Sequence, residues 1–336
     1  MAPGLLGVLG DVLVRVGWIA VFLTVGVGLA NVAVAFGALD RLDALAGPLT
    51  RPANLPPEVG TAILATTASP TAGYGMLAEF RESGVVDDRA TLVAVTINTF
   101  FGFAQHIFTF YAPVLIPILG LEVGLLYVGA RAAIALGITL VGILAGAVLL
   151  SAENLEVDAD VAPIEGDSTD ADGRDDPTQV ADGGATTTRG KLREAAGETA
   201  TKLREILPRL LVIYTIVAVV VARYDVTAVT GVADPLAGLL GLPGAAVPTV
   251  AVFAIDTTNG ALFIAPLVEN GTFTSREAVA TMLVGGIVSF AVSTFKRSIP
   301  FQFGVWGPEF GTKVVLVNTA LKVVFIAAAV AVLLVP

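Results

Sequence analysis

Residues 123–150 read VGLLYVGARAAIALGITLVGILAGAVLL, and Arg131 is the single charged side chain in this run. A helix that crosses a bilayer needs about 20 mostly apolar residues, because lipid offers no partners for backbone N–H and C=O groups. The run is long enough to cross. Comparable apolar stretches occupy residues 12–37, 90–108, 207–222, 278–295 and 314–335. The sequence therefore predicts an all-α polytopic membrane protein, placed in the cell membrane as a multi-pass chain.

The composition agrees with this prediction and excludes several kinds of site. The chain of 336 residues is 55% apolar and 14% charged, whereas soluble domains are about 25% charged. It has no cysteine and one histidine, so disulfides, thiolate metal sites and multi-histidine metal sites are excluded. The apolar run from Trp18 to Phe36 exceeds the core of a secretory signal, and we expect it to remain as a span.

The acidic residues are concentrated in the middle of the chain. The net charge is −10, and 14 of the 29 acidic residues lie between Glu153 and Glu205. Residues 151–197 contain many Asp, Gly and Thr and no aromatic residue, which predicts a disordered loop. Residues 192–210 are expected to form a surface helix that leads into the next span. An Asp-rich loop beside abundant Ala and Val resembles the composition of proteins from halophilic archaea.

An ungapped shift of 187 residues aligns the two halves of the chain. The matches include residue types that seldom coincide by chance in membrane proteins: Pro48 with Pro235, Gly73 with Gly260, Gly84 with Gly271, Arg89 with Arg276, and Glu122 with Glu309. The sequence thus predicts two copies of one membrane repeat. Their bounds are 1–150 and 198–336, with the acidic loop 151–197 between them.

Each half contains one apolar helical element with a polar interruption. The first reads PPEVGTAILATTASPTAGYGMLAEF at residues 56–80, and the second reads PTVAVFAIDTTNGALFIAPLVE at residues 248–269. Proline removes an amide donor, and glycine permits non-helical backbone. Non-helical backbone at membrane depth survives where it is buried in protein or lines a cavity. Each element is therefore either a broken span or a re-entrant hairpin.

The distribution of basic residues favours re-entrant hairpins. With six full spans and two re-entrant elements, the two repeats are inverted, and most Lys and Arg residues share one face. Positive charge concentrates in cytoplasmic segments, so we expect both termini outside. Arg131 and Lys322 lie within spans and are left out of this count.

Inverted repeats with interrupted helices are the usual architecture of secondary transporters, in which the helix ends hold the solute. A polar solute that leaves water must recover its hydrogen bonds, and the interruptions expose unpaired backbone groups. Asp256 is an ionisable group in an apolar stretch and hence a functional candidate, although Asp also caps helices. The predicted binding residues are Thr66, Thr67, Ser69, Thr71, Gly73, Asp256, Thr257, Thr258, Asn259 and Gly260.

A second group of polar residues follows Phe103 and Phe290 and is a candidate for coupling: Gln105, His106, Lys296, Arg297 and Gln302. Histidine is the side chain that ordinarily changes charge near physiological pH, so His106 could relay protons, or it could simply form a hydrogen bond at the membrane interface. Lys296 and Arg297 could attract an anionic solute or set the topology.

Three further polar residues are candidates for structural roles, and two of them also for a functional role. Glu122 and Glu309 are expected to cap helices or pair with cations, with a coupling role as the alternative. Asn98 is expected to bond a neighbouring helix.

No catalytic grouping is visible, and we do not expect an enzyme. The chain has no Walker loop, no Gly-x-Ser-x-Gly and no dinucleotide fingerprint, and no cofactor is expected. The expected partners are the lipid bilayer and a small polar solute or ion, without nucleic acid. A homo-oligomer is left open, as is the identity of any metal.

The segments ATTASPTAGYGMLAEFRESGVVDDR (65–89), NTFFGF (98–103) and AIDTTNGALFIAPLVENGTFTSRE (254–277) resemble the Gate, or nucleoside recognition, domain family. The resemblance implies a membrane core shared with concentrative nucleoside transporters, ferrous-iron permeases and spore maturation proteins A and B. It covers both apolar halves and is closest to archaeal proteins with a duplicated Gate domain. The chain lacks the GTP-binding domain and gate cysteines of the iron permeases, and the extra helices and acidic motifs of the nucleoside transporters.

Two functions follow as hypotheses. The first is a transporter or permease for a nucleoside-like solute or a cation, held between the two interrupted elements. The second is a membrane scaffold or assembly factor that does not transport, as the likeness to spore maturation proteins allows. A lipid-modifying enzyme is the least favoured reading, because no carboxylate cluster or nucleophile is present.

Overall fold

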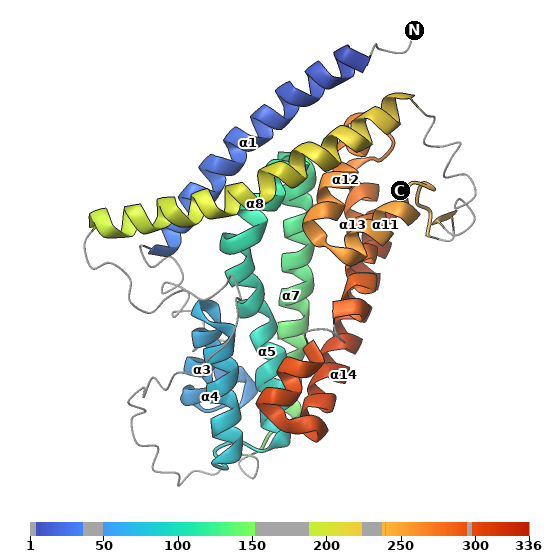
Figure 1. Ribbon diagram of the computed structural model, residues 1–336. Coiled ribbons are helices and arrows are strands. Elements are labelled where there is room, and N and C mark those ends of the chain that lie inside the picture. Colours follow the sequence, from blue (N-terminus) through green and yellow to red (C-terminus); the bar gives the residue numbers. More distant parts are fainter. Residues whose placement is uncertain are drawn as a thin grey trace.

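The computed structural model describes residues 5–35, 50–151, 188–223, 237–238, 240–293 and 298–335. These residues form helices and the turns between them, with no β-strand among them (Figure 1). The fold class is all-α, as predicted. In the first half the helices are α1 (Leu5–Ala35), η2 (Arg51–Ala53), α3 (Pro57–Ala68), α4 (Pro70–Glu82), α5 (Asp88–His106), η3 (Ile107–Leu115), α6 (Ile116–Leu119) and α7 (Leu121–Leu149). In the second half they are α8 (Thr188–Arg223), α11 (Ala246–Ile255), α12 (Thr257–Glu269), α13 (Ser275–Ser293) and α14 (Ile299–Leu334).

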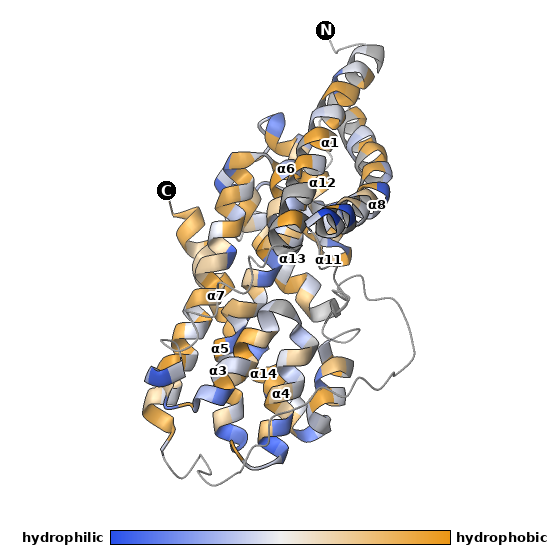
Figure 2. Cartoon of the chain, turned by 90° about the vertical axis from the view of Figure 1, so that its left-hand side faces the viewer, coloured by the Kyte–Doolittle hydropathy of each residue, from blue (hydrophilic) through white to orange (hydrophobic). Residues whose placement is uncertain are grey.

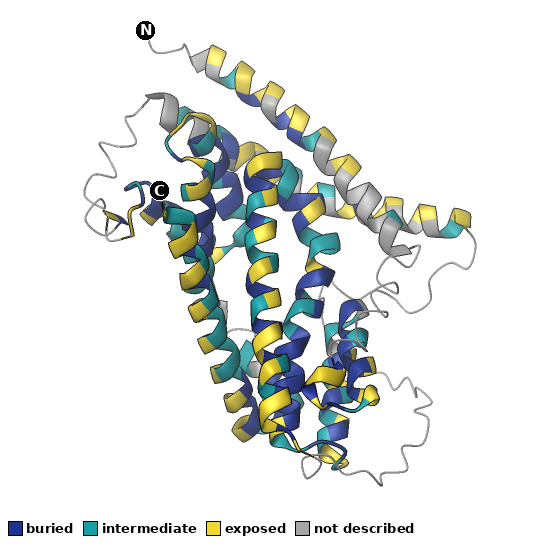
Figure 3. Cartoon of the chain, turned by 180° about the vertical axis from the view of Figure 1, so that it is seen from behind, coloured by how far each residue is buried: buried dark blue, intermediate teal, exposed yellow. Residues whose placement is uncertain are grey.

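Three helical segments in the described part are long and apolar enough to cross a membrane. They are Asp88–Leu119, Leu121–Leu149 and Phe301–Leu334. Figure 2 shows α7 and the segments beside it as mostly hydrophobic along their length, with hydrophilic residues gathered at the ends. Many large apolar side chains on α7 and α14 face outward, as Figure 3 shows by burial; they include Leu125, Leu140, Leu144, Val148, Leu316, Val324 and Val332. An exposed apolar surface of this kind is typical of contact with lipid.

The first of these segments is longer than the sequence predicts. The apolar run was expected to end near residue 108, yet the helix continues through η3 and α6 to Leu119. The reason is a stretch of π-helix, Ile107–Leu115, which contains Pro113. Its wider turn accommodates the missing amide donor and the bulk of the proline ring, which would break an α-helix.

The long helices approach closely where small residues face a neighbour. A Cβ atom on Gly142 of α7 would come within 3.0 Å of the backbone nitrogen of Ile97 on α5. Nearby, Thr139 donates a hydrogen bond to the carbonyl of Ile97 at 2.9 Å and accepts one from the amide of Phe100 at 3.2 Å. Small and hydroxyl residues at such crossings are characteristic of helix packing in membranes.

Both interrupted elements are tight helical hairpins. Helices α3 and α4 pack against each other and are joined at Ser69, which is extended with φ −145° and ψ 112°. Helices α11 and α12 are joined in the same way at Asp256, with φ −154° and ψ 129°. The interruption is therefore a turn between two short helices in each half.

Positions 187 residues apart share unusual backbone conformations. Gly84 and Gly271 have φ of 82° and 80°, and Gly120 and Gly307 have φ of 81° and 75°. Glycine tolerates these left-handed values because it has no Cβ atom. The two halves thus use the same local turns at the positions that the sequence aligns.

The halves do not fold as separate bodies. Helix α4 packs against the start of α14, with the ring centroids of Tyr74 and Phe301 5.6 Å apart and those of Tyr74 and Trp306 6.1 Å apart. In the same manner α12 packs against α6, and α1 packs along α8. Each hairpin is therefore held partly by a segment of the other half.

Helix α8 begins inside the segment that composition assigns to a disordered loop. The predicted loop spans residues 151–197, but α8 starts at Thr188. Residues 188–197 include Lys191, Arg193, Glu194 and two alanines, and these residue types favour a helix. Residues 152–187, the most acidic part of the predicted loop, lie outside the described residues.

Candidate functional site

The polar residues of the first interruption are used mainly to build the α3–α4 turn. The hydroxyl of Ser69 accepts a hydrogen bond from the amide of Ala72 at 3.3 Å and so caps α4. The hydroxyls of Thr66 and Thr67 donate to the carbonyls of Ala62 and Leu64 within their own helix, at 3.3 and 2.7 Å. Both threonines are buried.

Gly73 and Thr71 complete the first interruption. A Cβ atom on Gly73 would overlap Thr66, so the glycine allows α3 and α4 to approach. Thr71 belongs to α4, and its side chain lies outside the described part.

The second interruption has the same arrangement with a carboxylate as the cap. Oδ1 of Asp256 accepts a hydrogen bond from the amide of Asn259 at 2.7 Å, and this is the one hydrogen bond to that carboxylate among the described residues. Thr257 and Thr258 are half-buried in the first turn of α12, and Gly260 packs against Phe253. Asp256 is therefore a helix cap that retains a second carboxylate oxygen.

The two interrupted elements pack mainly on different helices. The α3–α4 hairpin packs against α5 and α14, whereas the α11–α12 hairpin packs against α13, α8 and α6. Figure 1 shows the two hairpins at opposite ends of the molecule. The reason is the interleaving of the halves, since each hairpin docks on its own long helix and on a segment from the other half.

The residues predicted for coupling are dispersed. Gln105 is buried, whereas His106 is exposed and its Nδ1 lies 2.9 Å from the carbonyl oxygen of Gly102. Gln302 is buried on α14, where its Oε1 accepts a hydrogen bond from Nε1 of Trp306 at 2.6 Å. Lys296 and Arg297 lie outside the described residues.

Gln302 belongs to a buried polar cluster that the sequence did not indicate. The hydroxyl of Tyr74 on α4 faces the side chains of Asn98 on α5 and Gln302 on α14. Neither polar atom of the buried Asn98 side chain completes a hydrogen bond of good geometry within the described part. Elsewhere among the described residues, two more buried polar atoms have no hydrogen-bond partner, Oδ1 of Asn259 on α12 and Oγ1 of Thr281 on α13. Tyr74 carries no sequence signal of its own, because an aromatic residue in an apolar helix predicts packing.

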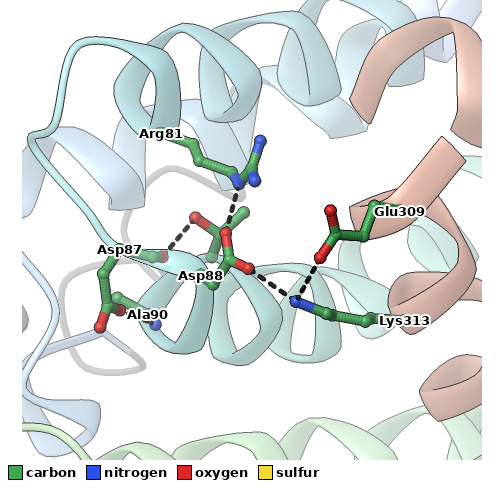
Figure 4. Close-up of polar contacts among 7 residues, drawn as sticks. Arg81, Asp87, Asp88, Ala90, Glu309 and Lys313 are labelled. Atoms are coloured by element: carbon green, nitrogen blue, oxygen red, sulfur yellow. Dashed lines mark hydrogen bonds and ion pairs between the residues drawn. The ribbon is translucent and has the colours of Figure 1, made fainter. Parts of the chain in front are cut away.

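Charged residues at the turn before α5 form a network that fastens α4, α5 and α14 together (Figure 4). Nε of Arg81 lies 2.8 Å from Oδ1 of Asp88, and Nζ of Lys313 lies 3.0 Å from Oδ2. Glu309 lies 3.8 Å from Lys313. Arg81 also lies over the ring of Phe310, 4.2 Å from its centroid. Glu309 thus pairs with a cation, as one reading of the sequence expected, and the network is structural.

Glu122 aligns with Glu309 in the 187-residue frame and accepts a hydrogen bond from the hydroxyl of Ser275 at 2.6 Å. Arg276, the next residue, donates to the carbonyl of Val332 at 3.1 Å. These contacts join the beginnings of α7 and α13 to the end of α14. Glu122 therefore links the two halves at one face of the bundle.

Two half-buried cations face neighbouring helices of the bundle, Arg131 on α7 and Lys322 on α14. Nη2 of Arg131 donates to the hydroxyl of Tyr111 at 3.3 Å, and Nζ of Lys322 lies 4.6 Å from the ring centroid of Phe290. Placing one cation at the centre of a membrane helix costs roughly 2.5–3.5 kcal/mol on insertion scales. Guanidinium has five N–H donors and ammonium has three, so one hydroxyl and one ring satisfy only a small part of them.

Among the described residues, no group of three or more His, Asp or Glu side chains is arranged to hold a metal ion.

Two archaeal proteins are similar to this chain over most of its length. Uncharacterized protein MJ0871 of Methanocaldococcus jannaschii is 24% identical over 307 residues, covering 90% of this chain and 88% of that protein. Uncharacterized protein MJ0880 of the same organism is 21% identical over 316 residues, covering 93% and 95%. No family model and no solved structure matches. Alignments of this extent include residues on both sides of the central acidic segment.

Proposed function

We propose that this protein is a multi-pass transporter or permease of the cell membrane for a small polar solute or ion. In this proposal six helices cross fully, the α3–α4 and α11–α12 hairpins are re-entrant, and the two repeats are inverted. Each hairpin helix has 10 to 13 residues and spans about 15–20 Å at 1.5 Å per residue. That is short of the ~30 Å of hydrocarbon, which supports the re-entrant form. The resemblance to Gate proteins favours a nucleoside-like solute or a cation.

The observation that carries the proposal is a pair of buried polar atoms without partners, one in the second interrupted element and one on the helix packed against it. Oδ1 of Asn259 lies one turn after Asp256, and Oγ1 of Thr281 lies on α13, which packs against both α11 and α12. An unsatisfied buried polar group costs about 1–3 kcal/mol. A polar solute that supplies the missing hydrogen bonds would offset this cost, and the second oxygen of Asp256 is available to it.

The two hairpins pack mainly against different helices. Because the hairpins lie apart, we place binding at each hairpin separately, with the α11–α12 hairpin as the principal site. The alternative is a scaffold that does not transport. It is favoured by the capping roles of Ser69 and Asp256, which account for both residues without any solute.

Flux through proteoliposomes tests the two functions. Purified protein would be reconstituted, and uptake of radioactive uridine and radioactive sodium ions would be measured. We expect uptake of one of them to fall at least severalfold in Asn259→Leu, which removes the unpaired amide oxygen at similar volume. Asn318→Leu is the matched control, since Asn318 is bonded to its own helix at 3.2 Å. Uptake equal to that of empty liposomes for both probes would support the scaffold instead.

A further inference from the structure

The two half-buried cations come from different halves of the chain and face the same stretch of α13. Arg131 on α7 approaches Gly286 of α13, and Lys322 on α14 lies over the ring of Phe290, one helical turn further along α13. Helices α7, α13 and α14 pack mutually around them. Within the described part of the chain, no Asp or Glu forms an ion pair with either cation. Like charges gathered in an apolar bundle are unfavourable unless something of opposite charge joins them.

Both cations lie at the middle of the apolar layer. Glu122, Arg276 and Val332 mark one face of the bundle, because hydrogen bonds join the ends of α7, α13 and α14 there. Arg131, Gly286 and Lys322 each lie nine or ten residues from that face along their own helices. At 1.5 Å per residue this depth is about 15 Å, half of the ~30 Å hydrocarbon core.

Few atoms lie between Arg131 and α13 at Gly286. A Cβ atom built on Gly286 of α13 would meet nothing within 4 Å except Nη1 of Arg131, at 3.8 Å. The guanidinium therefore extends across the glycine toward α13 while its other end donates to the hydroxyl of Tyr111. Tyr127 lies within electrostatic range on the same helix. Most donors of both cations remain free of acceptors within the described residues.

We propose that Arg131 and Lys322 bind a small oxyanion, a free carboxylate or phosphate compound, at the centre of the bundle. The forked guanidinium matches the two oxygens of such a group, and the ammonium adds a second charge. This site adjoins the α11–α12 hairpin, whose Phe253 contacts Gly285 and the ring of Tyr127, but its ligand differs in charge from the nucleoside-like solute or cation proposed above. It therefore goes beyond the proposed function: the anion is bound whether or not a neutral solute or cation also moves.

A lipid headgroup offers the same chemistry, but the depth argues against it. Headgroup phosphates lie outside the hydrocarbon core, and cations that serve them lie near helix ends. Arg131 and Lys322 lie about 15 Å inside. A solute anion that enters from water is the occupant that this position favours.

Thermal unfolding of the purified full chain in detergent tests the site directly. Sodium phosphate, and separately sodium succinate, would be titrated against sodium chloride at equal ionic strength. We expect the melting temperature of the wild type to rise with one of the two oxyanions. In Arg131→Met and in Lys322→Met, the concentration needed for half of the rise should increase roughly tenfold or more, since each variant removes a charge-assisted hydrogen bond.

Lys313→Met is the matched control, a lysine on the same helix whose partners are Asp88 and Glu309. It should respond to the oxyanion as the wild type does, even if its baseline melting temperature is lower. Lys322→Met should melt higher than the wild type in chloride alone, because the repulsion between the two cations is removed. A purely structural lysine predicts the reverse, a lower melting temperature with an unchanged oxyanion response.

The outcomes separate this inference from the proposed function. A melting temperature indifferent to both oxyanions, or an unchanged response in Lys322→Met, would overturn the site. Stabilisation by phosphatidylglycerol in nanodiscs, without any effect of phosphate or succinate, would overturn the assignment to a free solute. An oxyanion response that depends on Arg131 and Lys322 in a protein that passes neither uridine nor sodium would leave this site standing while the proposed transport fails.

Discussion

Ser69 and Asp256 occupy the same place in two hairpins. Each is the one extended residue between two short helices, and each accepts a hydrogen bond from the amide three residues later. Extended geometry with a side-chain acceptor is what a helix N-cap requires, and Ser and Asp are among the residues that supply it best. The carboxylate at Asp256 differs from the hydroxyl at Ser69 in bearing charge. A helix cap needs only an acceptor oxygen, so capping alone does not require the charge of Asp256.

The capping role of Asp256 predicts a graded effect on stability. Asp256→Ala should lower the free energy of unfolding by about 1 kcal/mol, because the amide of Asn259 loses its acceptor. Asp256→Asn and Asp256→Ser should retain most of the stability, since each keeps an acceptor oxygen. Thermal melting in detergent measures the three variants. Equal losses in all three would show that charge, and not the cap, stabilises the hairpin.

Within each hairpin, the tight turn depends on a glycine that faces the preceding helix. Gly73 lies against Thr66 and the carbonyl of Ala62, and Gly260 lies against Phe253. The positions in each pair are equivalent in the 187-residue frame, so both hairpins close by the same contact. Backbone approach of this kind leaves no space for a methyl group.

Gly73→Ala should therefore open the α3–α4 hairpin. The added methyl would lie 2.7 Å from the carbonyl oxygen of Ala62, and overpacking of this kind costs about 1–3 kcal/mol. Gly75→Ala on the same helix is the control, since a Cβ atom there meets nothing within 4 Å. It should be neutral or slightly stabilising, because alanine favours a helix more than glycine does. Melting temperatures of the two variants in the same detergent make the comparison; equal effects would exclude the close contact.

In the whole molecule, the two halves are interleaved. Contacts from α4 to α14, from α6 to α12 and from α7 to α13 all cross between the halves. Hydrogen bonds from Ser275 to Glu122 and from Arg276 to Val332 close one face of the bundle. Because helices of the two halves pack together, polar residues from both halves can face the same helix. Arg131 and Lys322 both face α13 in this way.

Disulfide trapping tests the interleaving, and the chain has no native cysteine to confuse the result. On treatment with a short bifunctional methanethiosulfonate reagent, Glu122→Cys with Ser275→Cys should become linked through disulfides, since the wild-type side chains are hydrogen-bonded at 2.6 Å. After proteolysis in the acidic loop, the two halves should then migrate together on a denaturing gel until reduced. Glu122→Cys with Ser83→Cys is the control, because α4 ends at the far side of the bundle (Figure 1). Efficient trapping of the control pair would contradict the arrangement.

Much of the local structure follows from the sequence. The apolar runs predicted helices that the structure contains, and the polar residues with Pro70 and Gly73 predicted the interruption at Ser69. The 187-residue frame aligned Gly120 with Gly307, which share one unusual backbone conformation. The π-helix at Pro113 was not predictable, because an internal proline ordinarily ends a helix. The polar cluster at Tyr74 was not predictable either, because its members come from three helices.

What the sequence determined by itself is where helices run and where they break. Those features depend on apolar length, proline, glycine and capping residues, all of which act between neighbours in the chain. Only the tertiary structure decided that the two hairpins dock on different helices and that Arg131 and Lys322 face the same stretch of α13. Contacts between distant segments depend on how whole helices pack, and the side chains that determine this packing are apolar and nearly interchangeable in sequence.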